Sequence, residues 1–267
     1  MDPEVGVFYA ESRESPARPV LTFVNYAMHP DTTGGTRLSA DYPGALSRML
    51  ALYKGAEMLT VFANGTCGNL NHLDFRWAAP QSSPQEAHRL GVILAAAVFK
   101  AYPKQHPLPD FPSGSLKVSK EIVRLPLPSF TEAELAQART DARTATDSTR
   151  DGFMRLVRAH RILDVAAREG KPQEVEVQII ALGRETAWVS WPGEIFVELG
   201  LSVKAASPFP HTYNIELANG TIGYIPNKSA WPEGNYEVES ARVAEGSGEL
   251  LVTSALRQLS TLFGKQE

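Results

Sequence analysis

The sequence has few of the features that mark disulfide-rich, nucleic-acid-binding or membrane proteins. Its 267 residues include a single cysteine, Cys67, so no disulfide can form within the chain, and cysteine content does not indicate the compartment. The 26 lysines and arginines are outnumbered by 30 acidic residues and are mixed with them along the chain. Because no basic stripe is available to neutralise phosphates, we expect no nucleic-acid partner.

Long apolar runs are also missing. No segment approaches the roughly 18 apolar residues of a membrane span. The first residues, Met1–Val5, lack the basic and then apolar pattern of a signal peptide. The sequence thus predicts no transmembrane segment and no signal peptide. With 43% hydrophobic and 21% charged residues, the chain can bury a full core as one large domain.

The first part of the chain has a pattern typical of a βαβ unit. A β-rich run at residues 20–27 ends before His29, residues 41–55 have an apolar helical stripe that Asp41 can cap, and residues 58–63 form a second buried strand. A right-handed crossover would make the two strands parallel, with both carboxyl ends at one edge. His29 and the loop at 64–72 should then share the edge where open α/β sheets bind ligands.

The remaining pattern predicts further helices and strands in one mixed sheet. We expect helices at 85–102, 195–206 and 248–263, strands at 115–125 and 212–218, a hairpin of strands at 174–182 and 186–190, and a loop at 219–235. A polar helical hairpin, broken near Asp151-Gly152, forms an insert at about 131–169. The predicted class is α/β, a mixed β-sheet with flanking helices, in a single domain spanning 1–267.

Several residues could carry chemistry, although each also has a structural explanation. The loop at 62–72 is rich in glycine and asparagine, which suits either an ordinary turn or a nest of backbone amides for an anion. Glu194 follows a buried strand and Pro-Gly, where a carboxylate is more often a helix dipole partner. Tyr224 alone is an ordinary half-buried aromatic. His29 at a strand end is as compatible with function as with structure.

No histidine lies in an HExxH or similar closely spaced pair, so spacing alone gives a metal site little support. Cys67 is a further candidate, as a thiol nucleophile on the glycine-rich loop. Buried cysteines at strand ends are usually inert small hydrophobes, and no sequence feature indicates a lowered thiol pKa.

Several blocks resemble one family in their order and character. Together they are similar to the catalytic domain of neutral/alkaline non-lysosomal ceramidases, and most closely to bacterial ceramidase-like hydrolases. The blocks are Phe23–Pro30, Ser39–Gly44, Phe62–Asn71, Trp191–Glu194, Gly223-Tyr224 and Tyr236–Ser240. The resemblance implies a zinc site with His29, Glu194 and Tyr224 as ligands. A fourth ligand, a histidine in a Thr-His-Thr-His-like segment, normally lies upstream of the position where this chain begins, so the N-terminal part of the family's catalytic domain is expected to be missing.

The resemblance also implies a nucleophile loop with one departure. Asn71 stands where ceramidases have a serine, and an amide side chain cannot act as a hydroxyl nucleophile. Attack by water activated by zinc remains chemically possible, with Asn71, Asn69 and Gly68 orienting the substrate or stabilising the oxyanion. The expected function is zinc-dependent hydrolysis of non-peptide amides in a small-molecule or lipid-like substrate. The alternative is a non-catalytic binding module on the same fold. The family resemblance suggests a secreted or periplasmic protein.

Overall fold

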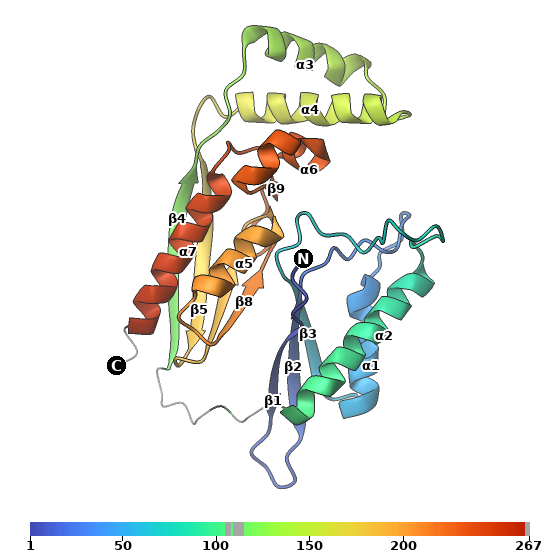
Figure 1. Cartoon of the computed structure of the whole chain (residues 1–267), viewed down its shortest axis with the longest axis vertical. Coiled ribbons are helices and arrows are strands. Elements are labelled where there is room, and N and C mark those ends of the chain that lie inside the picture. Colours follow the sequence, from blue (N-terminus) through green and yellow to red (C-terminus); the bar gives the residue numbers. More distant parts are fainter. Residues whose placement is uncertain (105–107, 109–114, 265–267) are drawn as a thin grey trace. The chain divides into compact units, whose positions relative to one another are not determined.

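The chain forms two compact units, Met1–Asp110 and Phe111–Glu267, each with its own core. The computed structural model describes residues 1–104, 108 and 115–264 (Figure 1). Both units combine a mixed β-sheet with flanking helices, which confirms the predicted α/β class.

The sheet of the first unit contains the predicted βαβ unit and one further strand. Its order is β1 (Gly6–Glu11), β2 (Pro19–Tyr26) and β3 (Leu59–Asn64), with β1 antiparallel and β3 parallel to β2. Tyr26 pairs with Asn64 at the shared carboxyl edge, as expected. We did not predict β1, because its six residues are mostly half-buried and lack clear alternation. Its backbone bonds to β2 hold it in the sheet.

Two helices, α1 (Asp41–Lys54) and α2 (Pro84–Ala101), cover one face of this sheet (Figure 1). The core between these helices and the sheet is apolar and includes Val24, Tyr42, Leu46, Leu50 and Val98. The expected role of Asp41 as the helix cap was wrong. Ala40 is the N-cap and makes no side-chain capping bond, whereas the Asp41 carboxylate accepts hydrogen bonds from the Thr33 and Tyr42 amides at 2.8 Å each. Asp41 therefore ties the preceding loop to the start of α1.

The second unit is built on a four-stranded sheet in the order β4 (Leu116–Leu125), β5 (Gln173–Leu182), β6 (Thr186–Ser190) and β8 (His211–Ile215). The predicted hairpin of β5 and β6 is confirmed, and β8 runs parallel to β6. Helices α5 (Val197–Ala206) and α7 (Ser247–Gly264) pack on the sheet around a core that includes Trp191, Ile195, Leu251 and Leu259 (Figure 1).

The helical insert is a pair of helices, α3 (Glu132–Thr144) and α4 (Arg150–Ala166). The predicted helical hairpin is present, but its break lies at 145–149, slightly before the predicted position near Asp151-Gly152, and Gly152 belongs to the first turn of α4. Thr149 caps that turn, its hydroxyl accepting from the Gly152 amide at 3.1 Å. A Cβ at Gly152 would stand 2.0 Å from the Thr146 carbonyl oxygen. The glycine thus serves close packing and does not end a helix.

The segment predicted as one loop at 219–235 contains regular structure. Strand β9 (Tyr224–Ile225) pairs in parallel with β7 (Glu194–Ile195), and a 3₁₀ helix (Lys228–Glu233) leads into helix α6 (Asn235–Ser240). Glu194 and Ile195 therefore belong to a strand, and the helix that we expected from residue 195 starts at Val197. Two-residue strands are too short to give a sequence pattern.

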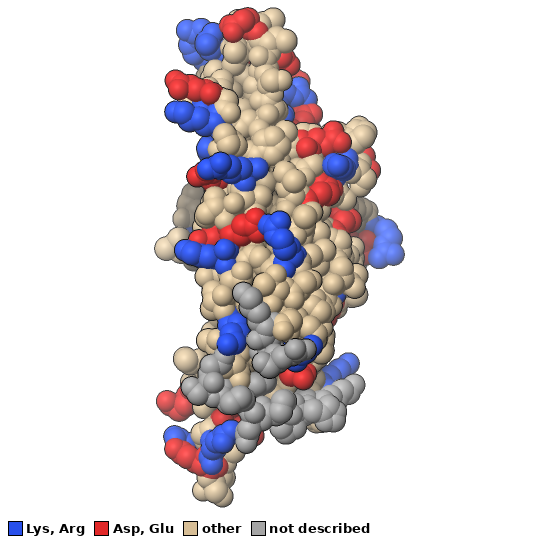
Figure 2. All heavy atoms as spheres, turned by 90° about the vertical axis from the view of Figure 1, so that its left-hand side faces the viewer, with Lys and Arg blue, Asp and Glu red and all other residues tan. Residues whose placement is uncertain are grey.

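Charges of both signs are interspersed over the molecular face shown in Figure 2. Cross-strand ion pairs contribute to this pattern in the second unit, where Arg124 binds Glu174 at 2.9 Å and Lys120 lies 3.6 Å from Glu176. Among the helices that the structure describes, none is both long and apolar enough to cross a bilayer.

Candidate active site

Glu194 and Tyr224 are neighbours across the parallel pair β7–β9. The register aligns Glu194 with Tyr224 and Ile195 with Ile225. The Glu194 amide donates to the Gly223 carbonyl at 3.0 Å, and the Phe196 amide donates to the Ile225 carbonyl at 3.2 Å. Residues aligned across neighbouring strands project to the same face, and here the Tyr224 hydroxyl donates a hydrogen bond to the Glu194 carboxylate. Two residues 30 positions apart thus form one polar pair.

The Trp-Pro-Gly segment before Glu194 places this pair. Trp191 is fully buried, and its indole Nε1 donates to Asn214 Oδ1 at 2.9 Å, which fixes the chain to β8. The Ile222 amide donates to the Pro192 carbonyl at 3.0 Å. A Cβ at Gly193 would stand 2.5 Å from the Gly223 oxygen, so only glycine allows the two backbones to approach this closely.

Tyr224 is held in its protonated form. Burial raises the pKa of its phenol, and the negative charge of Glu194 and the hydrogen bond to that carboxylate raise this pKa further. In this structure Tyr224 is therefore a hydrogen-bond donor next to a carboxylate.

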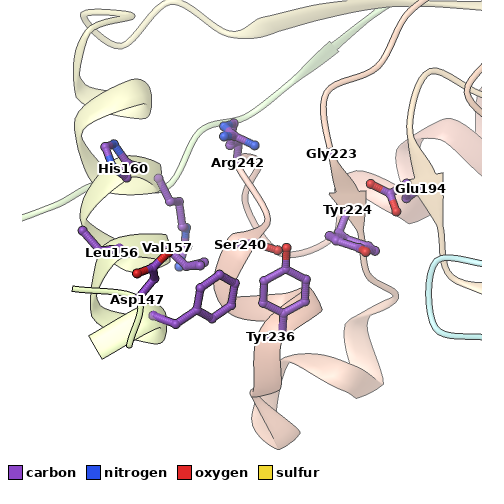
Figure 3. A pocket seen from close by; sticks show the side chains of 12 residues that line it. Asp147, Leu156, Val157, His160, Glu194, Gly223, Tyr224, Tyr236, Ser240 and Arg242 are labelled. Atoms are coloured by element: carbon purple, nitrogen blue, oxygen red, sulfur yellow. The ribbon is translucent and has the colours of Figure 1, made fainter. Parts of the chain in front are cut away.

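A pocket of about 430 Å³ opens beside this pair, with walls from several elements of the second unit (Figure 3). In the view of Figure 3, α4 forms one wall through Leu156, Val157 and His160. Helix α6 contributes Tyr236 and Ser240, and Glu194 and Tyr224 lie on the far side from α4. The full lining is Asp147, Phe153, Leu156, Val157, His160, Arg161, Glu194, Gly223, Tyr224, Tyr236, Ser240 and Arg242.

Three aromatic rings extend from the polar pair toward α4. The rings of Tyr224 and Tyr236 meet edge to face, with centroids 5.7 Å apart, and Tyr236 stacks with Phe153 at 5.9 Å. Tyr236 and Phe153 are 38% and 41% exposed, so their surfaces remain accessible to a ligand. The pocket therefore combines a polar end with an aromatic flank.

His29 lies in the first unit, three residues beyond the end of β2. Its Nδ1 is 2.9 Å from the Leu70 carbonyl oxygen, and its backbone amide donates to the same oxygen at 3.3 Å. Because a carbonyl can only accept, the proton of the neutral ring is on Nδ1 and the lone pair is on Nε2. A backbone carbonyl that orients a histidine in this way is common among metal-binding histidines.

The predicted shared edge of His29 and the glycine-rich loop is present, because Leu70 belongs to that loop. Gly68 is buried, whereas Asn69 and Asn71 are exposed. The Asn71 amide group donates to Asp31 Oδ2 at 3.1 Å, and its Oδ1 accepts from the Leu73 amide at 3.2 Å. Asn71 thus ties the loop to the segment after β2.

The other candidates in this loop have structural roles. The His72 side chain is 2% exposed, and its two ring nitrogens contact Asp31 and the Gln81 carbonyl oxygen at 3.2 and 2.9 Å. Cys67 is fully buried, which agrees with an inert thiol and not with a reactive one.

Within the described residues, no cluster of three or more histidine, cysteine, aspartate or glutamate side chains could hold a metal. Of the three predicted ligands, Glu194 and Tyr224 meet in the second unit, and His29 belongs to the first. The pocket adds Phe153, Arg161 and Arg242 to this pair, and the sequence alone singles out none of the three. Tyr236 also lines the pocket and belongs to the Tyr236–Ser240 block of the family resemblance, which assigned it no role.

Comparison with known proteins gives matches by structure alone. No protein-family model and no curated protein sequence matches the chain. The crystal structure of neutral ceramidase from Pseudomonas aeruginosa superposes with a TM-score of 0.66 at 15% identity, over 93% of this chain and 45% of that one. A ceramidase complexed with C2 gives a TM-score of 0.65 at 14% identity, over 93% and 47% of the two chains. The chain thus spans about half the length of these enzymes, and over that half it has the fold of a neutral ceramidase.

Proposed function

We propose that this chain carries a zinc-dependent active site that hydrolyses non-peptide amides, with His29, Glu194 and Tyr224 as zinc ligands. The observation that carries the proposal is the aligned Glu194–Tyr224 pair at the polar end of a pocket. The ceramidase-like fold supports it, because the solved relative is an amide hydrolase by name.

The residues present fit zinc in their chemistry. An imidazole nitrogen and a carboxylate are donors of the kinds that zinc accepts, and the Tyr224 phenol would join them by losing its proton. The Leu70 carbonyl holds the His29 ring in the tautomer that leaves the lone pair on Nε2, as a ligand requires. When bound, zinc would polarise the substrate carbonyl and favour attack by water.

The chain's own residues supply substrate binding and orientation. The aromatic flank of Tyr236 and Phe153 would take the apolar part of the substrate. Asn71 is engaged with Asp31 and Leu73, so we assign it a positioning role for the loop and no nucleophilic role. The backbone amides of Gly68 and Asn69 would stabilise the oxyanion.

Hydrolysis of short N-acyl amides by the zinc-loaded protein tests this function. Glu194→Gln should reduce kcat/KM by about a hundredfold or more, because a neutral amide is a poor zinc ligand. Glu233→Gln, which changes an exposed glutamate on the 3₁₀ helix, should leave the rate unchanged. A chelator should abolish turnover by the wild type. Equal rates for Glu194→Gln and the wild type would refute the assignment.

A specific observation favours a second candidate, a binding module without catalysis. The side chain at the family's serine position is an asparagine that bonds to Asp31 after β2 and to the Leu73 amide. This candidate predicts that the zinc-loaded protein binds amides in the pocket but hydrolyses none of them, which the same assay decides.

A further inference from the structure

Two arginines line the pocket close to the Glu194–Tyr224 pair. Arg242 follows α6, and its Nε donates to Asp164 Oδ2 at 3.1 Å. A Cβ at Gly223 would stand 3.2 Å from Arg242 Nη1, so the guanidinium reaches the residue directly before Tyr224. Figure 3 shows Arg242 at the rim between α4 and β9. One edge of this guanidinium is bound to Asp164, and the other is directed toward the site.

Arg161, on α4, is engaged less fully by the fold. Its Nη1 donates to the Glu239 carbonyl oxygen at 3.3 Å, and its guanidinium lies 5.6 Å from the centroid of the Phe130 ring. Its Nε is buried and has no hydrogen-bond partner among the described residues. Burial lowers the pKa of this guanidinium, and the nearby Glu239 charge opposes that effect. A partly buried guanidinium with an unpaired donor is costly, and Arg161 lines the pocket, so an anion bound there would offset this cost through its charge.

Other arginines of α4 are bound in a different way. Arg155 and Arg158 make ion pairs with the carboxylates of Asp141 and Glu239. The Arg158 guanidinium donates to both oxygens of the Glu239 carboxylate. Arg161 therefore donates only to the backbone carbonyl oxygen of Glu239. Arg161 is thus the α4 arginine that lines the pocket and has no carboxylate bound to it by a hydrogen bond within the described residues.

The acidic side chains of the pocket lie away from Arg242. In the view of Figure 3, Arg242 and His160 lie toward one end, Asp147 lies toward the other, and Glu194 is on the opposite side from α4. The Glu194 carboxylate accepts the Tyr224 hydroxyl proton in a hydrogen bond. In this view the carboxylates of Asp147 and Glu194 are therefore both separated from Arg242.

We propose that the pocket selects amides that carry an oxyanion group, a carboxylate or a phosphate, which Arg161 and Arg242 bind. The planar fork of guanidinium matches such groups in two-point contacts. Phe153 and Tyr236 would contact an aromatic or apolar group next to the amide. The amide part of this substrate class rests on the proposed function, whereas the oxyanion site is expected whether or not the amide is cleaved.

Calorimetric binding of matched ligand pairs to the full chain tests the oxyanion site without requiring turnover. One pair is N-phenylacetylglycine and its uncharged N-phenylacetylglycinamide. The other is N-phenylacetylethanolamine with and without a phosphate ester. The charged member of at least one pair should bind about tenfold more tightly or better, as expected for charge-assisted hydrogen bonds. The pair with the larger preference identifies the oxyanion.

Arg161→Gln should abolish this preference. Arg155→Gln is the matched control, because it removes a guanidinium that binds Asp141 from the same helix outside the pocket lining, and it should retain the preference. Arg242→Gln gives an independent second variant, and thermal unfolding establishes that each variant is folded. Equal binding within both pairs by the wild type, or an unchanged preference in folded Arg161→Gln and Arg242→Gln, would overturn the proposal. A preserved preference without any hydrolysis would support the oxyanion site and contradict only the hydrolase.

Discussion

At the scale of single residues, Trp191 connects core packing to the site. Its indole is fully buried and donates to Asn214 Oδ1, while Asn214 Nδ2 donates to the Gly200 carbonyl at 3.0 Å. The side chain that packs the core therefore also fixes the start of the segment that carries Glu194.

Replacing Trp191 by phenylalanine should lower the free energy of unfolding by about 2–4 kcal/mol. The change leaves a space in the core and a buried amide oxygen without its donor. Urea unfolding of the second unit measures the loss. Trp77→Phe, at a position 56% exposed in the first unit, is the control and should change stability by less than about 0.5 kcal/mol. A loss below about 1 kcal/mol for Trp191→Phe would show that the indole bond contributes little.

The sequence predicted some site residues and missed others for physical reasons. His29 lies at a strand end, where position alone is as compatible with function as with structure, and Glu194 and Tyr224 were selected through the family resemblance. Arg161 lies on a helix with a polar pattern typical of a solvated surface, and its partner Arg242 is 81 residues away. No local pattern reveals that tertiary structure brings such residues to one pocket.

At the scale of secondary-structure elements, the paired strands β7 and β9 position the candidate ligands. Their approach depends on Gly193, because any side chain there would collide with the Gly223 carbonyl oxygen. These strands have only two residues each, so their order depends on the backbone contacts around them.

Gly193→Ala should therefore cost about 1–3 kcal/mol of stability and reduce zinc affinity, because the β7–β9 register must shift. Chemical unfolding and metal titration measure the two effects. Gly34→Ala is the matched control, since a Cβ at Gly34 meets no atom within 4 Å. If Gly193→Ala were as stable as Gly34→Ala and kept its zinc affinity, close backbone approach would not be what aligns Glu194 with Tyr224.

Long periodic elements were predictable, and short or irregular ones were not. Helices α1, α2 and α7 and strands β2 to β6 follow apolar patterns of sufficient length. Strands β1, β7 and β9 and helix α6 depend on pairing or packing with distant segments. The break before α4 was misplaced because a glycine required for tight packing resembles a helix terminator.

At the scale of the whole molecule, ion pairs join elements that are distant in sequence. Arg158 on α4 binds Glu239 on α6, and Arg257 on α7 binds Glu121 on β4. The hydrogen bond from Arg158 lowers the pKa of Glu239 below its usual value of about 4.5. The folded state therefore favours the charged carboxylate more strongly than the unfolded state does.

This pKa shift predicts a loss of stability in acid. The contribution of Glu239 is present above its unfolded pKa and is lost as pH falls from about 4.5 through the lower folded value. Urea midpoints between pH 7 and pH 3 should fall less steeply for Glu239→Gln than for the wild type. Glu233→Gln, at an exposed position, should follow the wild type. Parallel curves for Glu239→Gln and the wild type would contradict the predicted linkage.

Zinc binding to the metal-stripped protein tests the proposed site most directly. Isothermal titration should give one zinc per chain, and His29→Ala and Tyr224→Phe should each weaken binding about tenfold or more. His88→Ala, which changes an exposed histidine on α2, should not affect affinity. Two results would contradict a metal site formed by His29, Glu194 and Tyr224. One is the absence of zinc binding by the wild type, and the other is wild-type zinc affinity in both His29→Ala and Tyr224→Phe.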